Sequence, residues 1–173
     1  MSAASPIEQA PRDLLLGKTV VITAAAGTGI GFALARRCML EGATVLISDL
    51  HERRLGEAAD KLEAECGTRP ASFLCNVTDE DTVRGLVEHS IAELGHVDAW
   101  MNNAGLGGNA SVHEMTDEQW AVVLDVTLTG TFRCMRAILP HMYERGSGVI
   151  VTTWRSSSIA LGFIPSERHV SAR

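Results

Sequence analysis

The stretch TVVITAAAGTGIG at residues 19–31 decides the fold. Its first five residues are apolar or β-branched, which is typical of a strand buried on both faces of a sheet. Small residues follow at 24–29, and residues 30–40 then carry apolar side chains at helical spacing, among them Ile30, Leu34 and Cys38. We therefore expect a strand, a tight glycine-containing loop and a helix in direct succession.

A glycine-rich loop between a strand and a helix is suited to binding a pyrophosphate. Glycines let backbone N–H groups approach the phosphate oxygens, and the helix N-terminus adds partial positive charge. The spacing departs from G-x-G-x-x-G, because Phe32 stands where that pattern has its last glycine. From this loop alone, a dinucleotide site and a plain strand-to-helix turn both remain open.

Alternating strands and helices extend from this loop to residue 153. Further strands are expected at residues 44–48, 71–75, 97–101 and 149–153. Helices are expected at 53–66, from the capping residue Thr78 to Leu94, and at 117–144, where a capping box at Thr116 opens a helix that Pro140 can bend. The alternation predicts an α/β fold, a Rossmann-type doubly wound parallel sheet whose first five strands are present and whose C-terminal part is missing.

The same pattern divides the chain into three parts. Residues 1–17 are a polar N-terminal lead-in, residues 18–153 form the dinucleotide-binding domain, and residues 154–173 are an irregular C-terminal tail with no recognisable sixth strand.

Composition excludes several classes of protein. A chain of 173 residues with a net charge of −6 and 5% aromatic residues lacks the basic stripe and stacking platforms of a nucleic-acid binder. No segment approaches about 18 apolar residues, and residues 1–18 lack a signal-peptide pattern, so we expect no membrane partner and a cytoplasmic location. The four scattered cysteines form no C-x-x-C pair, which favours reduced core residues over a metal site.

Asp49 suggests which dinucleotide binds. It ends the second strand about 20 residues beyond Gly29, where a carboxylate accepts hydrogen bonds from the adenosine ribose hydroxyls. A carboxylate would also repel a 2′-phosphate, so the sequence predicts NAD, with NADP the less favoured cofactor. Arg53 and Arg54 are the opposing signal, although solvated charges at the start of a helix are the favoured interpretation.

Four stretches in the right order resemble the short-chain dehydrogenase/reductase family of classical type. Residues 23–31 resemble T-G-x-x-x-G-x-G, residues 75–78 (CNVT) stand where the family has Asp-Val, residues 102–105 match N-N-A-G, and residues 120–132 resemble W-x-x-x-x-x-V-N-L-x-G-x-F. The resemblance implies hydride transfer between NAD(P) and a secondary alcohol or ketone. It implies cofactor contacts from Gly27, Thr28, Gly29, Ile30, Gly31, Asp49, Asn76, Val77, Asn103, Ala104 and Gly105.

Three positions depart from the family pattern. The loop is one residue longer and has Ala24 or Ala25 in place of its first glycine; Gly27 is expected to take over that turn, since a positive φ costs alanine on the order of 1 kcal/mol. Asn76 replaces an aspartate, with an amide oxygen that can still accept from an adenine amino group. Thr127 replaces an asparagine of the catalytic relay, whose two donors a hydroxyl cannot reproduce.

The family's catalytic Tyr-x-x-x-Lys motif is absent from this sequence. The single tyrosine, Tyr143, is followed four residues later by Ser147, and both lysines, Lys18 and Lys61, lie upstream. Ser158 is a weak candidate for the family's catalytic serine, and a serine-rich loop is the favoured interpretation. Because the pattern ends near residue 153, we interpret the chain as a truncated or frame-shifted reductase.

Three functions therefore stay open. The chain is an NAD-dependent alcohol/ketone oxidoreductase with impaired turnover, a catalytically inactive NAD-binding or interaction protein, or a non-functional truncated product. The expected partners are the nucleotide cofactor and, if the chain is active, a small-molecule alcohol or ketone. An unpaired fifth strand, together with a long helix that the family commonly uses in oligomer contacts, predicts a homo-oligomer or a self-associating chain.

Overall fold

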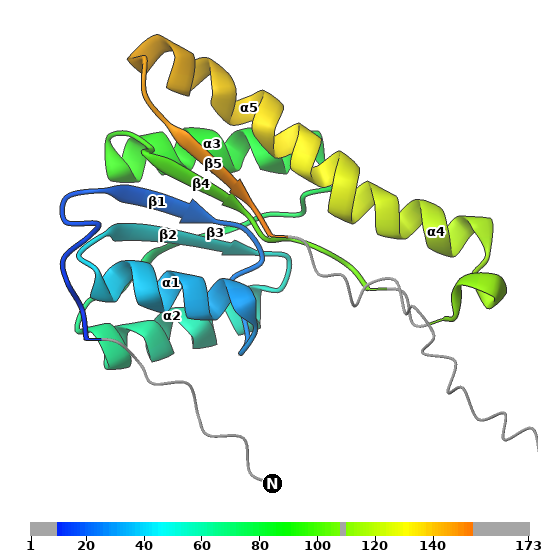
Figure 1. The fold of residues 1–173 in the computed structure, drawn as a ribbon, viewed down its shortest axis with the longest axis horizontal. Helices are drawn as coiled ribbons and strands as arrows, with labels where there is room; N and C mark the ends of the chain where they lie inside the picture. Colours follow the sequence, from blue (N-terminus) through cyan, green and yellow to red (C-terminus); the bar gives the residue numbers. More distant parts are fainter. Residues whose placement is uncertain (1–9, 108–109, 154–173) are drawn as a thin grey trace, which may run out of the picture.

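The computed structural model describes residues 10–107 and 110–153. Within them, a five-stranded parallel sheet has the strand order β3-β2-β1-β4-β5, with helices on both faces (Figure 1). The strands are β1 Thr19–Ile22, β2 Thr44–Asp49, β3 Ala71–Leu74, β4 Ala99–Asn102 and β5 Val149–Thr152. The Rossmann-type α/β fold is thus confirmed through its first five strands, each within about two residues of its predicted bounds.

β1 lies at the centre of the sheet and carries apolar side chains on both faces. Val20, Val21 and Ile22 are at most 1% exposed, as expected for a parallel strand covered on both sides. The strand order reverses at β1, which pairs with β2 on one side and with β4 on the other. Ligands of open α/β sheets bind at such a reversal, outside the carboxyl ends of the strands.

Each face of the sheet packs against its own helices (Figure 1). The helices are α1 Ile30–Leu40, α2 Glu52–Cys66, α3 Glu80–Leu94, α4 Asp117–Leu124 and α5 Gly130–Arg145. On the face of α1 and α2, Phe32 packs in one core cluster with Ile22. On the face of α3 and α5, Ile138 belongs to a second cluster with Trp100, which is fully buried.

The cap of α3 differs from the prediction. Asp79 is the N-cap, and its side chain accepts from the N–H groups of Asp81 and Thr82. Thr78 instead donates its hydroxyl to the side-chain oxygen of Asn76, at 2.9 Å. Both residue types favour N-caps, and the Asn76 turn decides between them by engaging Thr78.

The predicted long helix is continuous from Asp117 to Arg145 but contains an irregular turn (Figure 1). The capping box at Thr116 and Gln119 opens α4 as predicted, but α4 ends at Leu124. A π-helical turn, Asp125–Thr129, then leads into α5. Pro140 lies inside α5 without ending it, so the irregular turn is upstream of the proline.

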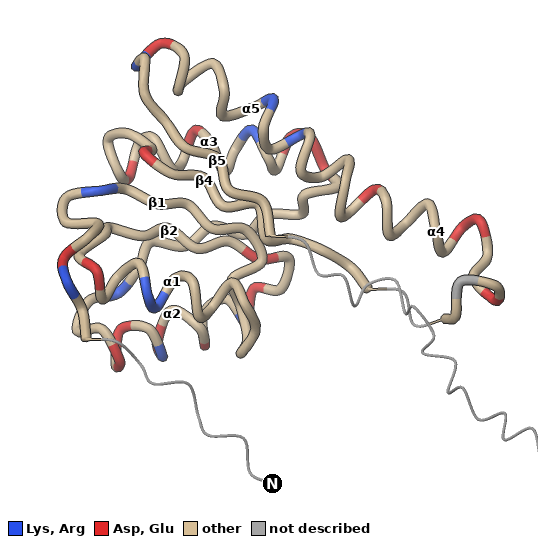
Figure 2. The backbone as a smooth tube through the Cα atoms, in the orientation of Figure 1, with Lys and Arg blue, Asp and Glu red and all other residues tan. Residues whose placement is uncertain are grey.

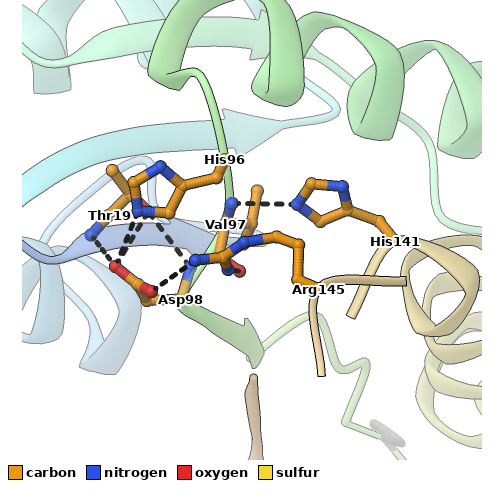
Figure 3. A network of polar contacts seen from close by, with 6 residues as sticks. All are labelled: Thr19, His96, Val97, Asp98, His141 and Arg145. Atoms are coloured by element: carbon orange, nitrogen blue, oxygen red, sulfur yellow. Dashed lines mark hydrogen bonds and ion pairs between the residues drawn. The ribbon is translucent and has the colours of Figure 1, made fainter. Parts of the chain in front are cut away.

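A polar network holds the amino end of β4 (Figure 3). The carboxylate of Asp98 accepts from the N–H of Thr19 at 3.1 Å and from Arg145 of α5 at 3.2 Å. The N–H of Val97 donates to Nε2 of His141, at 3.2 Å. The N–H of Val97 is thus bonded to a side chain, and regular pairing of β4 begins at Ala99 rather than at Val97.

β5 is an edge strand in the part of the chain that the structure describes. There it pairs only with β4, and Val149 and Val151 are 59% and 40% exposed. The predicted apolar edge is therefore present.

Charged residues lie mainly on the helices and loops, with acidic and basic positions interspersed (Figure 2). Among the residues that the structure describes, no helix is long and apolar enough to cross a bilayer. The same residues contain no group of three or more side chains that could hold a metal ion.

Candidate cofactor site

The loop after β1 crosses the carboxyl end of β2. The N–H of Ala25 donates to the carbonyl oxygen of Ser48 at 2.9 Å, and the N–H of Ala26 donates to Oδ2 of Asp49 at 3.3 Å. The glycine-rich loop and Asp49, which are separated in sequence, are therefore in direct contact. This is the arrangement on which the dinucleotide prediction depends.

Two residues of this loop adopt a positive φ. Gly27 has φ +92°, as expected, but Ala24 also keeps a left-handed backbone, with φ +52°. The expectation that Gly27 would relieve the alanine of this turn is therefore wrong. Ala24 bears a conformational cost on the order of 1 kcal/mol, which the surrounding contacts must offset.

Gly31 allows α1 to approach the loop closely. A Cβ at this position would lie 2.5 Å from Nδ2 of Asn103, 2.6 Å from the carbonyl oxygen of Ala24 and 2.9 Å from Cα of Ala25. No side chain fits there without displacing backbone. In the G-x-G-x-x-G pattern the last glycine allows close packing of the helix, and here Phe32 occupies that position. Gly31 allows the close packing instead.

The N-terminus of α1 is suited to an anion. Its N-cap, Gly29, makes no side-chain capping bond, and the first turn contains no acidic residue. The N–H groups of a first helical turn have no partners within the helix, and the helix dipole adds positive potential there. Gly29 and Ile30 are both exposed at this end, so a phosphate can reach it.

Asp49 is a buried carboxylate with acceptor capacity to spare. It is 9% exposed, and its oxygens accept from the N–H groups of Ala26 and His51. Burial raises the pKa of Asp49, while the Ala26 N–H and the charge of Arg54 act in the opposite direction. Each carboxylate oxygen has lone pairs left for a ribose hydroxyl.

A hollow beside the loop is bordered by basic side chains. Gly27 and Thr28 line it together with Arg54, Glu57, Ala58 and Lys61 of α2. Arg53 instead pairs with Glu57 at 2.6 Å on the exposed face of α2. Of the two arginines that oppose the NAD prediction, only Arg54 therefore borders this hollow.

Asn76 and Val77 follow β3 but are largely engaged by the protein. Oδ1 of Asn76 accepts from the N–H and the hydroxyl of Thr78, at 3.1 and 2.9 Å, which leaves no lone pair for an adenine amino group. Val77 is 8% exposed, and its side chain packs against Gly130 at the start of α5.

The loop after β4 is bonded to the loop after β1. The hydroxyl oxygen of Thr23 accepts from the N–H groups of Asn103 and Ala104, at 2.9 and 3.1 Å. Next along the chain, Gly105 lies beside Thr127, and the Thr127 hydroxyl accepts from the N–H of Leu106 at 3.2 Å. The π-helical turn therefore places Thr127 against the N-N-A-G segment.

Sequence reasoning missed the part that two threonines play here. The sequence predicts Thr153 only as the end of the fifth strand, and Thr23 as the end of the first strand and the start of the loop motif; neither prediction gives the hydroxyl a bonding partner. In the structure their hydroxyls bond to residues 102–104. A hydroxyl where an otherwise apolar strand ends is the signal that could have found them.

Neither the single tyrosine, Tyr143, nor the candidate serine, Ser158, is found beside the loop after β1 in the described residues. Tyr143 lies in α5 and is 77% exposed, whereas Ser158 lies outside the described residues. An open and largely apolar groove runs between the β4 loop and α4, lined by residues that include Leu106, Met115 and Val123.

Comparisons with known proteins agree with this geometry. The family model described as short chain dehydrogenase matches residues 18–166. One relative is the (5R,7aS)-5-hydroxy-7a-methyl-1-oxo-2,3,5,6,7,7a-hexahydro-1H-indene-carboxyl-CoA reductase of Mycobacterium tuberculosis. It is 49% identical over 147 residues, which cover 85% of this chain and 56% of the relative. The NADP-dependent mannitol dehydrogenase of Alternaria alternata is 35% identical over 157 residues, covering 89% and 58%.

Solved structures give the same result. A crystal structure of a short chain dehydrogenase from Mycobacterium smegmatis superposes with a TM-score of 0.79 at 49% identity, covering 86% of this chain and 62% of the other. The chain thus spans a little more than half the length of the proteins that it matches.

Proposed function

We propose, since the chain belongs to the short-chain dehydrogenase family, that it binds NAD where β1, β2 and β4 end, and that the protein transfers hydride between NAD and a secondary alcohol or ketone. One observation carries the cofactor proposal. The loop that ends at the uncapped N-terminus of α1 is hydrogen-bonded to the buried carboxylate of Asp49. This contact supports a pyrophosphate site at the loop with a ribose acceptor next to it.

Different residues would bind different parts of the dinucleotide. The loop N–H groups and the first turn of α1 would hold the pyrophosphate, and Asp49 would accept from the adenosine ribose. When bound, NAD supplies the hydride acceptor. The segment 103–105 lies beside this loop, and the apolar groove by Leu106 and Met115 would receive the carbon skeleton of the alcohol or ketone.

NADP is the alternative cofactor. Arg54 and Lys61 border the hollow beside Gly27 and Thr28, and cations there favour a 2′-phosphate. We favour NAD because Asp49 is buried in contact with the loop, whereas Arg54 is an exposed residue of α2. One relative, the mannitol dehydrogenase of Alternaria alternata, is NADP-dependent by its name, which is why NADP remains the alternative.

We propose that the 173-residue chain by itself binds the cofactor but turns over slowly. Its single tyrosine is an exposed residue of α5, and Ser147, rather than a lysine, stands four residues later. Loss of a positioned general acid/base removes about 10²–10⁴-fold of rate. A catalytically inactive NAD-binding or interaction protein is therefore the second candidate function.

A titration and a turnover assay on the same preparation test this proposal. We expect saturable quenching of protein fluorescence by NADH, and negligible NAD reduction with a panel of secondary alcohols. Tyr143→Phe and Ser158→Ala should leave any residual rate unchanged. Failure of both NADH and NADPH to bind would reject the cofactor proposal, and a robust rate that one of these substitutions abolishes would reject the second candidate.

We also propose a cytoplasmic location. Cys38, Cys75 and Cys134 are buried free thiols, and Cys66 is a partly exposed one. Burial raises the pKa of Cys75 to about 11 and that of Cys134 to about 12, so neither is a reactive thiolate. Four unpaired thiols are typical of a reducing compartment.

A further inference from the structure

The side chain of Asn103 links the carboxyl ends of β1, β4 and β5. Its Nδ2 donates to the carbonyl oxygens of Thr23, at 3.1 Å, and of Ala24, at 2.9 Å. Its Oδ1 accepts from the hydroxyl of Thr153, the residue after β5, at 3.0 Å. Since both amide hydrogens are bonded to protein carbonyls, this side chain acts on the loop rather than on a ligand.

Asn103 is bonded to Ala24, whose left-handed backbone is unfavourable for an alanine. Ala24 has φ +52°, and the only other non-glycine residue with a positive φ in the described chain is Asp13. The Cβ of an alanine is crowded in this conformation, so the residue leaves it readily unless its neighbours prevent the change. The bond from Asn103 fixes the Ala24 carbonyl and opposes that change.

The same carbonyl sets the start of α1. A Cβ on Gly31 would lie 2.6 Å from the Ala24 oxygen and 2.5 Å from Nδ2 of Asn103, so helix, carbonyl and amide are in close contact. Rotation of the Ala24 peptide would move this oxygen and displace residues 25–29. Those residues and the α1 N-terminus form the proposed pyrophosphate site.

From this geometry we infer that Asn103 is a positioning residue for dinucleotide binding: it holds Ala24 in the left-handed conformation that a glycine would adopt unaided. The inference rests on the proposed function, because the dinucleotide is the ligand that reports on the loop. It also explains how the chain keeps a glycine-type turn without the glycine.

A double-mutant cycle in the full chain tests this role. Asn103→Ala should weaken NADH binding about tenfold, since two hydrogen bonds to the loop are lost. Glycine adopts a positive φ without strain, so Ala24→Gly in the Asn103→Ala background should restore the affinity to within about threefold of the wild type. A side chain that only stabilised the sheet would not be rescued by a glycine in the loop.

Ala26→Gly in the Asn103→Ala background is the matched control. Ala26 lies in the same loop but without a positive φ, so this substitution adds flexibility without relieving strain and should restore nothing. Thr153→Val keeps both Nδ2 bonds and should change the affinity by less than about twofold. Equal rescue by the two glycines, or wild-type affinity of Asn103→Ala, would overturn the inference.

Hydrogen exchange without cofactor separates the inference from the proposed function. The amides of residues 23–31 should exchange about tenfold faster in Asn103→Ala and slow again when Ala24→Gly is added. Unchanged exchange would reject the role of Asn103 even if NADH binds. Absence of NADH binding to the wild type would reject the proposed function even if exchange behaves as expected.

Discussion

At the scale of single residues, Gly31 is the position where one methyl group matters most. Gly31→Ala should lower the free energy of unfolding by about 1–3 kcal/mol, because its Cβ would meet Asn103 and the Ala24 carbonyl at 2.5 and 2.6 Å. NADH affinity should fall with it. Denaturant titration of the cofactor-free protein measures the loss.

Gly29→Ala is the control for this substitution. Its φ of −87° suits any residue, and an added Cβ would meet nothing within 4 Å. Since an N-cap favours glycine over alanine, the free energy of unfolding should fall by at most about 1 kcal/mol, less than for Gly31→Ala. Equal losses in the two variants would show that α1 does not press on the loop at Gly31.

Asp49 sets the choice between cofactors in this account. The wild type should bind NADH at least about fivefold more tightly than NADPH, because a buried carboxylate beside a 2′-phosphate costs about 1–3 kcal/mol. Asp49→Ala should shrink this preference by removing the repulsion. Parallel fluorescence titrations with the two cofactors measure it.

Tighter binding of NADPH by the wild type would contradict this assignment. In that case Arg54→Ala, next to the hollow at Gly27, should remove the NADPH preference. Arg53→Ala is the matched control, because Arg53 pairs with Glu57 on the exposed face of α2.

Sequence alone predicted Asp49 beside the glycine-containing loop, where the structure has it, but not the left-handed backbone of Ala24. The aspartate follows from local counting, since it stands at the end of a strand and a typical distance beyond the loop. The φ of Ala24 depends on the bonds that Asn103 donates to the Thr23 and Ala24 carbonyls, and Asn103 is far away along the chain. No local pattern contains those bonds, so propensity placed the turn at Gly27 instead.

At the scale of elements, short-range signals located the helices but not their irregularities. The capping box at Thr116 is a local motif, and it was predicted correctly. The π-helical turn at Asp125–Thr129 was not, because its Thr127 contacts the β4 loop, a tertiary interaction. Thr78 and Asp79 are both good caps, and the bond from Thr78 to Asn76 settles which one serves α3.

The network at the amino end of β4 makes stability depend on pH (Figure 3). Burial lowers the pKa of His141, with Arg145 and His96 acting in the same direction and Glu144 against it. The unfolded chain therefore takes up a proton more readily than the folded one. The resulting stability is fully present above the unfolded pKa of about 6.5 and declines as the pH falls below it.

His141→Gln should reduce this decline. The glutamine oxygen can accept from the Val97 N–H in place of Nε2, and it does not titrate. Free energies of unfolding measured between about pH 7.5 and 5.5 should fall less steeply for the variant. A variant curve parallel to that of the wild type would show that His141 does not carry the pH dependence.

At the scale of the whole molecule, the alternation of strands and helices predicted the layers and the parallel sheet. The exposed edge at β5 was predicted from the loss of pattern after residue 153, and Val149 and Val151 are indeed exposed there. Substrate identity could not be predicted, since the groove by α4, the proposed substrate site, is built from loop and helix residues with no recognisable motif.

Self-association through this edge is an expected consequence. An apolar, unpaired strand invites strand addition, and a lysine on an edge strand discourages it. Val151→Lys should therefore reduce the association measured by sedimentation velocity, whereas Leu74→Lys on the opposite edge strand, β3, should not. A monomeric wild type would contradict the expectation.

We expect a nicotinamide dinucleotide to bind at the carboxyl ends of β1, β2 and β4. Amide chemical shifts of the full chain, recorded during titration with NAD, test it most directly. The account predicts saturable shift changes at residues 24–31, 49 and 103–105, and none at residues 96–98 at the opposite end of the sheet. Shift changes confined to that opposite end, or no changes with either NAD or NADP, would contradict it.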